Sequence, residues 1–393
     1  MPPSKYRYRT VHALCERVLA TLSEVLPDAP RPGLSAPARR VLVLKFGGLG
    51  EAVLARSLVE HLRRRNHCMR IDFIVEPRTV EVMTCATESF ARVYNPQSDG
   101  LGRALATLRE VRARRYDAVV DFEQTSVLTA AFMRLARVPI RIGLVPPIPS
   151  PRLRFLTHPV KLREDEAMWR AFIRLGRVLD QDLPEDVTTV PLNCSPDTRR
   201  WADQWWGKNI GFQAASRVVA FHLGVGPRAE YRRWPVARFA ELAARLRLHT
   251  PDVRVVMTGD SSEQFLYAEF ARCFTGNIVP ALDLGGIERT AALLQRCDLL
   301  VSADTGVMHL GAAMGTPTVG LFGPNTPACW APVGPRATYV YPTRQPCSPC
   351  INSYIRRLPA NCTASVKSAC MWDIAVDDVL EAARRVVRDT WLC

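Results

Sequence analysis

Asp304, Thr305 and Gly306, followed by His309, form the segment whose residue types best suit chemistry. The apolar run at residues 299–301 precedes them and predicts a buried strand, so they stand where a strand passes into a helix. Thr305 is a suitable N-cap, and His309, four residues on, shares its helix face. Because the N–H groups of a helix start favour an anion, the segment predicts a pyrophosphate site. A capped helix with a surface histidine is the alternative that these residues leave open.

Further polar residues follow other predicted strands of the C-terminal half. Arg232 opens the segment at residues 232–235, and Glu263 closes the segment at residues 259–263. An arginine can pair with phosphate oxygens, and a glutamate can accept hydrogen bonds from ribose hydroxyls. Each is an ordinary loop residue when taken alone. Their recurrence after successive strands favours one site at the carboxyl edge of the predicted sheet.

A glycine-rich loop at residues 46–51 ends in Glu51 and follows the apolar run at residues 41–44. The helical periodicity of residues 52–65 makes this loop a second strand-to-helix junction. Its spacing is not the G-x-G-x-x-G of dinucleotide-binding folds, and Glu76 is a poor match for the acid on their second strand. Glu51 could be a functional carboxylate or an acid favoured by the helix dipole, and the residues alone leave both open.

Four cysteines fall within one short segment near the C-terminus, with the spacing C-x2-C-x11-C-x7-C. They are Cys347, Cys350, Cys362 and Cys370. The first pair suits one knuckle of a tetrahedral thiolate site, so a structural Zn or Fe ion is one prediction. Reduced thiols and disulfides are the alternatives. Because four thiolates would fill the tetrahedron, the segment predicts no catalytic metal.

Strand-like apolar runs and amphipathic helices alternate along most of the chain, which is typical of doubly wound α/β domains. Sequence rich in Pro, Asp, Thr and Trp between residues 183 and 212 interrupts the alternation, so we expect a boundary near residue 215. We expect an N-terminal helix with a Pro-rich linker, two Rossmann-like domains and a closing helix. These parts span residues 1–40, 41–214, 215–374 and 375–393, and the second Rossmann-like domain contains the four cysteines.

The composition indicates a folded, basic protein. The chain has 393 residues, of which 48% are hydrophobic and 23% charged, and its net charge is +14. An anionic partner is therefore expected. Nucleic acid is not expected as that partner, because the basic residues alternate with acidic ones and form no patch interleaved with aromatic residues. No apolar run approaches the ~18 residues of a membrane-spanning helix, and no signal peptide is visible. The cytoplasm is the default location.

Several motifs together resemble one known family. They are residues 302–313, with the sequence SADTGVMHLGAA, residues 315–324, GTPTVGLFGP, the Arg-Trp-Pro of residues 233–235, and the C-S-P-C tail with its two later cysteines. In this combination the chain resembles the ADP-heptose:lipopolysaccharide heptosyltransferases, glycosyltransferase family 9. The likeness runs from about Val41 to Val387.

The resemblance implies a GT-B fold, with an acceptor-binding domain and a nucleotide-sugar-binding domain facing each other across a cleft. It implies an inverting transfer that needs no catalytic metal. The donor's diphosphate and sugar would be held by Asp304, Thr305, Gly306 and His309. Glu263 would hold the adenosine ribose, and Arg232 would lie near the phosphates.

On the acceptor side, the resemblance assigns the general base to Glu51, where the family has an Asp. Glu is one methylene longer, and a misplacement of ~1 Å can cost ~10²-fold in rate. Gly48 stands where the family often has a small hydroxylated residue, and Arg141 matches a family position beside the acceptor. Nearby basic residues could suit an anionic glycan or could be solvated surface charge. They are Arg137, Arg152, Arg154 and Lys161.

The expected function is transfer of heptose from ADP-heptose to an anionic glycan or glycolipid acceptor, such as the lipopolysaccharide inner core. Peripheral association with the inner face of the cytoplasmic membrane is consistent with that acceptor. Three alternatives stay open: a relative that moves another nucleotide sugar to a small molecule or protein, a non-catalytic nucleotide-sugar binder, and a metal-stapled nucleic-acid binder.

Overall fold

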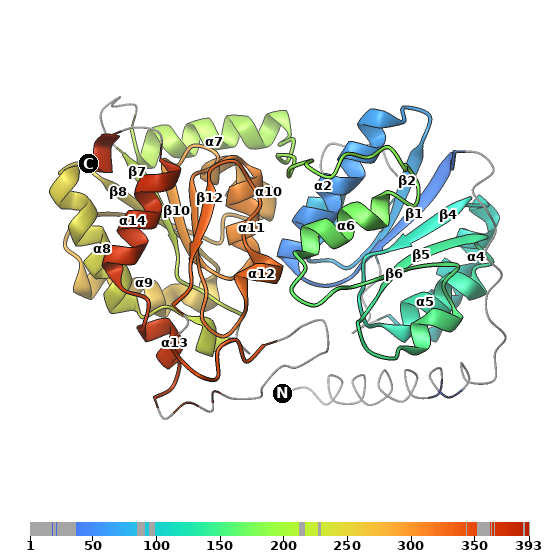
Figure 1. The fold of residues 1–393 in the computed structure, drawn as a ribbon. Coiled ribbons are helices and arrows are strands. Elements are labelled where there is room, and N and C mark those ends of the chain that lie inside the picture. The colour runs from blue at the N-terminus through green and yellow to red at the C-terminus, as the bar shows by residue number, and fades with distance from the viewer. Residues whose placement is uncertain are drawn as a thin grey trace. The chain divides into compact units, whose positions relative to one another are not determined.

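The computed structural model describes residues 18, 21, 37–84, 91–93, 99–211, 217–226, 229–342, 344–351, 362, 364, 366–387 and 390–392. The expected N-terminal helix, in residues 1–40, falls almost wholly outside the described residues. The chain divides into two compact units, Met1–Val187 and Thr188–Cys393 (Figure 1).

The first unit is built on a six-stranded parallel sheet with the order β3-β2-β1-β4-β5-β6. Its strands are β1 (Arg40–Lys45), β2 (Arg70–Val75), β3 (Ala91–Val93), β4 (Ala118–Asp121), β5 (Ile140–Val145) and β6 (His158–Lys161). The helices are α2 (Leu49–Arg65), α3 (Val80–Thr84), α4 (Leu101–Arg114), α5 (Val127–Leu135), α6 (Met168–Gly176) and the short 3-10 helix η1 (Pro151–Arg154).

Strand β1 shows why this sheet forms. Its residues from Val41 to Leu44 are at most 1% exposed, so both faces of the strand are covered, as expected for the centre of a parallel sheet. Helix α2 begins directly after the glycine loop, and Gly48 at its N-cap has a φ of 62°, a left-handed conformation that favours glycine. The local sequence therefore turns the chain sharply from strand to helix.

The second unit repeats the architecture with the order β12-β11-β10-β7-β8-β9. Its strands are β7 (Val218–His222), β8 (Arg254–Gly259), β9 (Asn277–Leu282), β10 (Leu299–Ala303), β11 (Thr318–Leu321) and β12 (Ala337–Val340). The helices are α7 (Pro196–Asn209), α8 (Val236–His249), α9 (Gln264–Cys273), α10 (Ile287–Leu294), α11 (Gly306–Ala313), α12 (Pro327–Trp330), α13 (Ala369–Trp372) and α14 (Val376–Val386), with 3-10 helices η2 (Glu230–Arg232), η3 (Ser261–Glu263) and η5 (Thr390–Leu392).

A fully buried tryptophan anchors the core of this unit. Trp234 donates a hydrogen bond of 3.2 Å to the carbonyl of Ile374 and packs edge-on against Phe239 at 4.8 Å. This contact ties the chain just before α8 to the segment that leads into α14. Helix α14 also packs on α8, β11 and β12, so the closing helix is part of the second unit.

The prediction of two doubly wound α/β domains is confirmed. The division lies at residue 187 rather than near residue 215. Helix α7 accounts for the difference. Its Trp-rich sequence interrupts the predicted alternation of strands and helices, but the helix packs against α10 of the second unit. In the part of the chain that the structure describes, no helix is both long and apolar enough to cross a bilayer.

Candidate active site

Each sheet has one place where its strand order reverses. In the first unit this switch point lies between β1 and β4, and in the second unit between β7 and β10. The connections that leave two such strands run in opposite directions and open a crevice at the carboxyl end, where ligands bind in this class of fold. The polar residues after these four strands are therefore the candidates for function.

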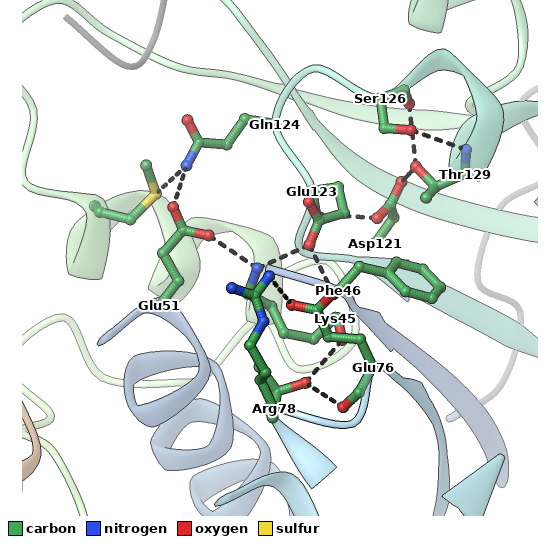
Figure 2. Close-up of polar contacts among 12 residues, drawn as sticks. Lys45, Phe46, Glu51, Glu76, Arg78, Asp121, Glu123, Gln124, Ser126 and Thr129 are labelled. Atoms are coloured by element: carbon green, nitrogen blue, oxygen red, sulfur yellow. Dashed lines mark hydrogen bonds and ion pairs between the residues drawn. The ribbon is translucent and has the colours of Figure 1, made fainter. Parts of the chain in front are cut away.

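In the first unit, one buried lysine lies between two carboxylates (Figure 2). The Lys45 ammonium at the end of β1 is 2.8 Å from Glu51 Oε2 and 2.7 Å from Glu123 Oε1. The lysine side chain is fully buried, whereas the side chains of Glu51 and Glu123 are 23% and 20% exposed. The two glutamate side chains are thus partly exposed at the switch point, whereas the side chain of their counter-ion is not.

The surroundings of Glu51 suit a group that exchanges a proton. Its second oxygen, Oε1, accepts a hydrogen bond of 3.2 Å from Gln124 Nε2. Burial raises the pKa of Glu51 above the ordinary value for glutamate; Lys45 opposes the rise and Glu123 adds to it. A carboxylate with a raised pKa is a stronger base once it is deprotonated. A Cβ on Gly48 would lie 3.2 Å from the Glu51 carboxyl carbon, so Gly48 packs directly against it.

Glu123 is held more firmly than Glu51. Its Oε1 also accepts from the backbone N–H of Phe46 at 2.9 Å, and its own N–H donates to Asp121 Oδ1 at 3.0 Å. Burial acts to raise the pKa of Glu123, but Lys45 and the Phe46 N–H outweigh it and hold the pKa below the ordinary value. Glu123 is therefore the stable anion of the pair.

Arg152 and Arg141 have structural partners. Arg152 is fully buried and forms a 2.9 Å ion pair with Asp121. It is therefore neither solvated surface charge nor available to an acceptor, the two roles that the sequence left open. The Arg141 guanidinium donates to the carbonyls of Phe155 and Val138, both at 2.7 Å. Arg141 thus ties β5 to the chain that follows η1.

In the second unit, Asp304 follows β10 and collects partners from two other segments. Arg232 Nη1 lies 3.4 Å from Asp304 Oδ2, and Asn325 Nδ2 donates to the same oxygen at 2.7 Å. Asn325 is buried, and its Oδ1 has no hydrogen-bond partner among the described residues. The sequence interpretation did not include Asn325; its place directly after Gly323-Pro324, at the end of a matching motif, was the available signal.

The contacts of Thr305 and the burial of His309 differ from those expected for a simple capped helix with a surface histidine. Thr305 occupies the N-cap of α11 but makes no capping hydrogen bond, because its hydroxyl pairs with Ser302 Oγ at 3.1 Å. The first N–H groups of α11, from Gly306, are therefore not covered by that hydroxyl. His309 is 3% exposed rather than on the surface, and its Nδ1 has no protein partner in the described part of the chain. Burial lowers the pKa of His309 while Asp304 opposes the fall, so the ring is neutral near pH 7.

Glu263 lies against the backbone at the carboxyl ends of β7 and β8. Its Oε2 accepts from the Asp260 N–H at 3.2 Å, and burial raises its pKa. A Cβ on Gly259 would lie 2.6 Å from the same oxygen, and one on Gly224 would overlap the carboxyl group. Only glycine at these two positions leaves room for the Glu263 carboxylate.

Cys347, Cys362 and Cys370 of the C-terminal segment are free thiols. Burial raises the pKa of Cys370 to about 11, and Cys350, Cys347 and Cys362 add to the rise, so the four lie near one another. Within the described residues, no group of three or more metal-ligating side chains is positioned to hold a metal ion. The segment therefore gathers the donor set that Zn or Fe prefers without closing it into a coordination shell.

Comparison with known proteins agrees with this geometry. Residues 104–357 match the model of glycosyltransferase family 9 (heptosyltransferase). Lipopolysaccharide heptosyltransferase 1 of Pseudomonas aeruginosa is 26% identical over 79% of this chain and 86% of its own length. Lipopolysaccharide heptosyltransferase 2 of Escherichia coli is 23% identical over 77% of this chain and 87% of its own.

Solved structures share the fold. A family 9 glycosyl transferase from Veillonella parvula superposes with a TM-score of 0.74 at 18% identity, covering 92% of this chain and 99% of its own. The E. coli ADP-heptose lps heptosyltransferase II gives 0.67 at 20% identity, covering 88% and 98%. The iron-containing dodecameric glycosyltransferase TibC of enterotoxigenic E. coli gives 0.53 at 12% identity, covering 92% and 77%.

Two Rossmann-type units, each with polar groups at its switch point, are typical of glycosyltransferases of the GT-B fold. The chain belongs to glycosyltransferase family 9, the heptosyltransferase family. The family, the fold and the enzyme class expected from the sequence are thereby confirmed.

Proposed function

We propose that this protein is an inverting heptosyltransferase that moves a heptose from ADP-heptose to a glycan of the lipopolysaccharide inner core. The names of its relatives support this donor and acceptor. The observation that carries the proposal is Glu51 at the first switch point, with a side chain that is 23% exposed and a carboxylate 2.8 Å from Lys45.

Glu51 is the base of the proposed reaction. It takes the proton of an acceptor hydroxyl, whose oxygen then bonds to the anomeric carbon of the heptose. The bond from that carbon to the diphosphate oxygen breaks, and ADP leaves with the electron pair, so the configuration inverts. The N–H groups at the start of α11 and the Arg232 guanidinium would stabilise the charge on the departing diphosphate. The transfer needs no cofactor.

The donor site is supported by polar atoms that the protein leaves unpaired. Buried polar groups nearly always have hydrogen-bond partners. Asn325 Oδ1 and His309 Nδ1 are buried without one among the described residues, and both residues interact with Asp304. We infer that the diphosphate and heptose of the donor supply these partners, together with Thr305 and Gly306, and that Glu263 accepts from the ribose hydroxyls.

The acceptor is inferred to be anionic. Between residues 124 and 163 every charged residue is basic. Arg137 and Lys161 of this stretch are exposed, and their charge would suit phosphates of a glycolipid core. Gly48 beside Glu51 would leave room for the acceptor hydroxyl. Such an acceptor would bring the protein to the inner face of the cytoplasmic membrane as a peripheral protein.

The cysteine segment is inferred to hold a structural metal ion and to take no part in the transfer. Cys347, Cys350, Cys362 and Cys370 offer four thiols of the kind that Zn and Fe prefer. The solved neighbour TibC is described as iron-containing. Small movements of the segment would have to bring the four sulfurs into coordination, where they would pin the loop after β12.

A pair of charge-removing variants on one helix tests the proposal. Glu51→Gln should lower the rate of heptose transfer by about 10²–10⁴-fold, the usual contribution of a general base, and leave donor affinity unchanged. Glu60→Gln is the matched control, because Glu60 also lies on α2, keeps 24% exposure and pairs with Arg64 at 3.1 Å. It should retain the wild-type rate.

The assay measures transfer from ADP-heptose and from other nucleotide sugars to a lipid A core acceptor, with and without its phosphates. Wild-type transfer from ADP-heptose is the expected result. Donor binding without any transfer would instead make the protein a nucleotide-sugar binder. A Glu51→Gln variant that transfers at the wild-type rate would remove the assignment of the base.

A further inference from the structure

The Lys45 cluster, which consists of Lys45, Glu51 and Glu123, contains one more carboxylate than the proposed reaction uses. Lys45 contacts both Glu51 and Glu123 and is itself fully buried (Figure 2). One positive charge thus faces two negative charges. A buried ammonium requires a counter-charge, but either carboxylate alone would supply it.

The neighbouring charges do not cancel this surplus. Glu76, after β2, pairs with Arg78 at 2.9 Å. Asp121, at the end of β4, pairs with Arg152 of η1, also at 2.9 Å. Each of these pairs is neutral within itself, so the group of Glu51, Lys45 and Glu123 keeps a net negative charge when both glutamates are ionised.

The second carboxylate is fixed in place by elements on two sides. Glu123 Oε1 accepts from the Phe46 N–H at 2.9 Å, and the Glu123 N–H donates to Asp121 Oδ1 at 3.0 Å. Thr129 of α5 donates to the other oxygen of Asp121 at 2.5 Å. Glu123 is therefore set as an anion on Lys45 before any substrate arrives.

A fixed anion on Lys45 changes the chemistry of Glu51. A cation within ~4–6 Å makes a carboxylate easier to ionise and a weaker base, whereas a second anion has the opposite effect. The negative charge of Glu123 offsets the electrostatic effect of Lys45 on Glu51. Lys45 can then orient Glu51 by a hydrogen bond without suppressing its basicity.

We propose that Glu123 is a positioning residue for glycosyl transfer, which shares Lys45 with Glu51 so that Glu51 is both oriented and basic enough to take the acceptor proton. The inference rests on the proposed role of Glu51. Nothing in the reaction requires Glu123 to contact either substrate.

The test removes one charge and keeps the shape. In Glu123→Gln the amide oxygen can still accept from Lys45 and Phe46, but the negative charge is gone. The acidic limb of the pH profile of kcat/KM should move to lower pH by about one unit, and the rate on the plateau should fall because Glu51 becomes a weaker base. Lys45→Met should move the same limb to higher pH, because two carboxylates then face each other without a cation.

Two further variants guard against a purely structural effect. Glu123→Asp keeps the charge and should return the acidic limb towards its wild-type position. Glu166→Gln is the matched control in the same unit, because the Glu166 side chain is 8% exposed and pairs with Arg174 at 2.6 Å rather than with Lys45. Its pH profile should equal that of the wild type.

The titration of Glu51 can also be read without any turnover. In protein labelled with carbon-13 at the glutamate carboxyl, the resonance that Glu51→Gln removes reports the protonation of Glu51. In Glu123→Gln this resonance should titrate at lower pH than in the wild type. An unchanged titration would overturn the inference. A shifted titration that the pH profile of transfer does not follow would instead refute Glu51 as the base, and with it the proposed function.

Discussion

Gly224 offers a direct test of the donor site, because it lies at the end of β7 and leaves room for Glu263. A Cβ at Gly224 would overlap the Glu263 carboxyl group. No rotation of an alanine methyl relieves this overlap, since a Cβ has no torsional freedom of its own. Gly224→Ala must therefore expel the Glu263 carboxylate from its position, although it changes no group that could contact a ligand.

The loss of donor affinity can be estimated from the hydrogen bonds at stake. If Glu263 binds the ribose, Gly224→Ala removes a charged acceptor, which contributes about 1.5–3 kcal/mol per hydrogen bond. This corresponds to a Kd for ADP about 10–150-fold higher. Glu263→Ala should produce the same loss.

The double variant separates this explanation from simple damage. Because both changes remove one interaction, Gly224→Ala with Glu263→Ala should bind ADP no more weakly than either single variant. It should also melt at a higher temperature than Gly224→Ala alone, because the shortened side chain gives the methyl group space. Gly226→Ala is the control in the same loop, since a Cβ there would meet nothing within 4 Å.

Isothermal titration calorimetry with ADP gives the four affinities, and thermal melting gives the stabilities. Wild-type ADP affinity in Gly224→Ala would refute the placement of Glu263 in the site. Additive losses in the double variant would show that the glycine and the glutamate act independently.

Two further predictions concern stability and metal content. Burial lowers the pKa of His222 to about 4, so the folded protein keeps its ring neutral where the unfolded chain would protonate it. The associated stability is present above the ordinary pKa of about 6.5 and is lost as pH falls towards 4, by about 3 kcal/mol in total. Urea unfolding between pH 7 and pH 4 should therefore show a smaller fall for His222→Gln than for the wild type, and equal falls would contradict the assignment. Elemental analysis of the purified protein should detect bound Zn or Fe that Cys347→Ser and Cys350→Ser both reduce, with transfer activity per folded molecule unchanged. A metal-free wild type would argue for four reduced thiols.

The fold was predictable because its signals are local. Apolar runs such as residues 41–44 and 299–301 are buried on both faces, and glycine or N-capping residues mark where each strand passes into a helix. The unit boundary was less accessible. Helix α7 carries three tryptophans at partly exposed positions, and only its packing on α10 shows that it belongs to the second unit.

The sequence could group the candidate donor-site residues because they follow strands in a recognisable motif, whereas it could not indicate their partners. Asn325 reaches Asp304 from the loop after β11, and no spacing rule links the two positions. Lys45 closes an apolar strand, where a charged residue is unusual and was the one signal available for it. Glu123 stands after the strand that neighbours β1 in the sheet but not in the sequence.

The same contacts favour the proposed functional interpretation of Glu51 over the purely structural one. An acid at a helix start gains only about 0.3–1 kcal/mol from the dipole and needs no partner from another element. Glu51 does have a partner from another element, because the Lys45 ammonium of β1 lies 2.8 Å from its carboxylate. Yet the burial of Lys45 does not require Glu51, since Glu123 already supplies a fixed counter-charge at 2.7 Å. A second, partly exposed carboxylate, raised in pKa by its burial and placed at a switch point, costs stability. The proposed role of Glu51 as the base would account for this cost.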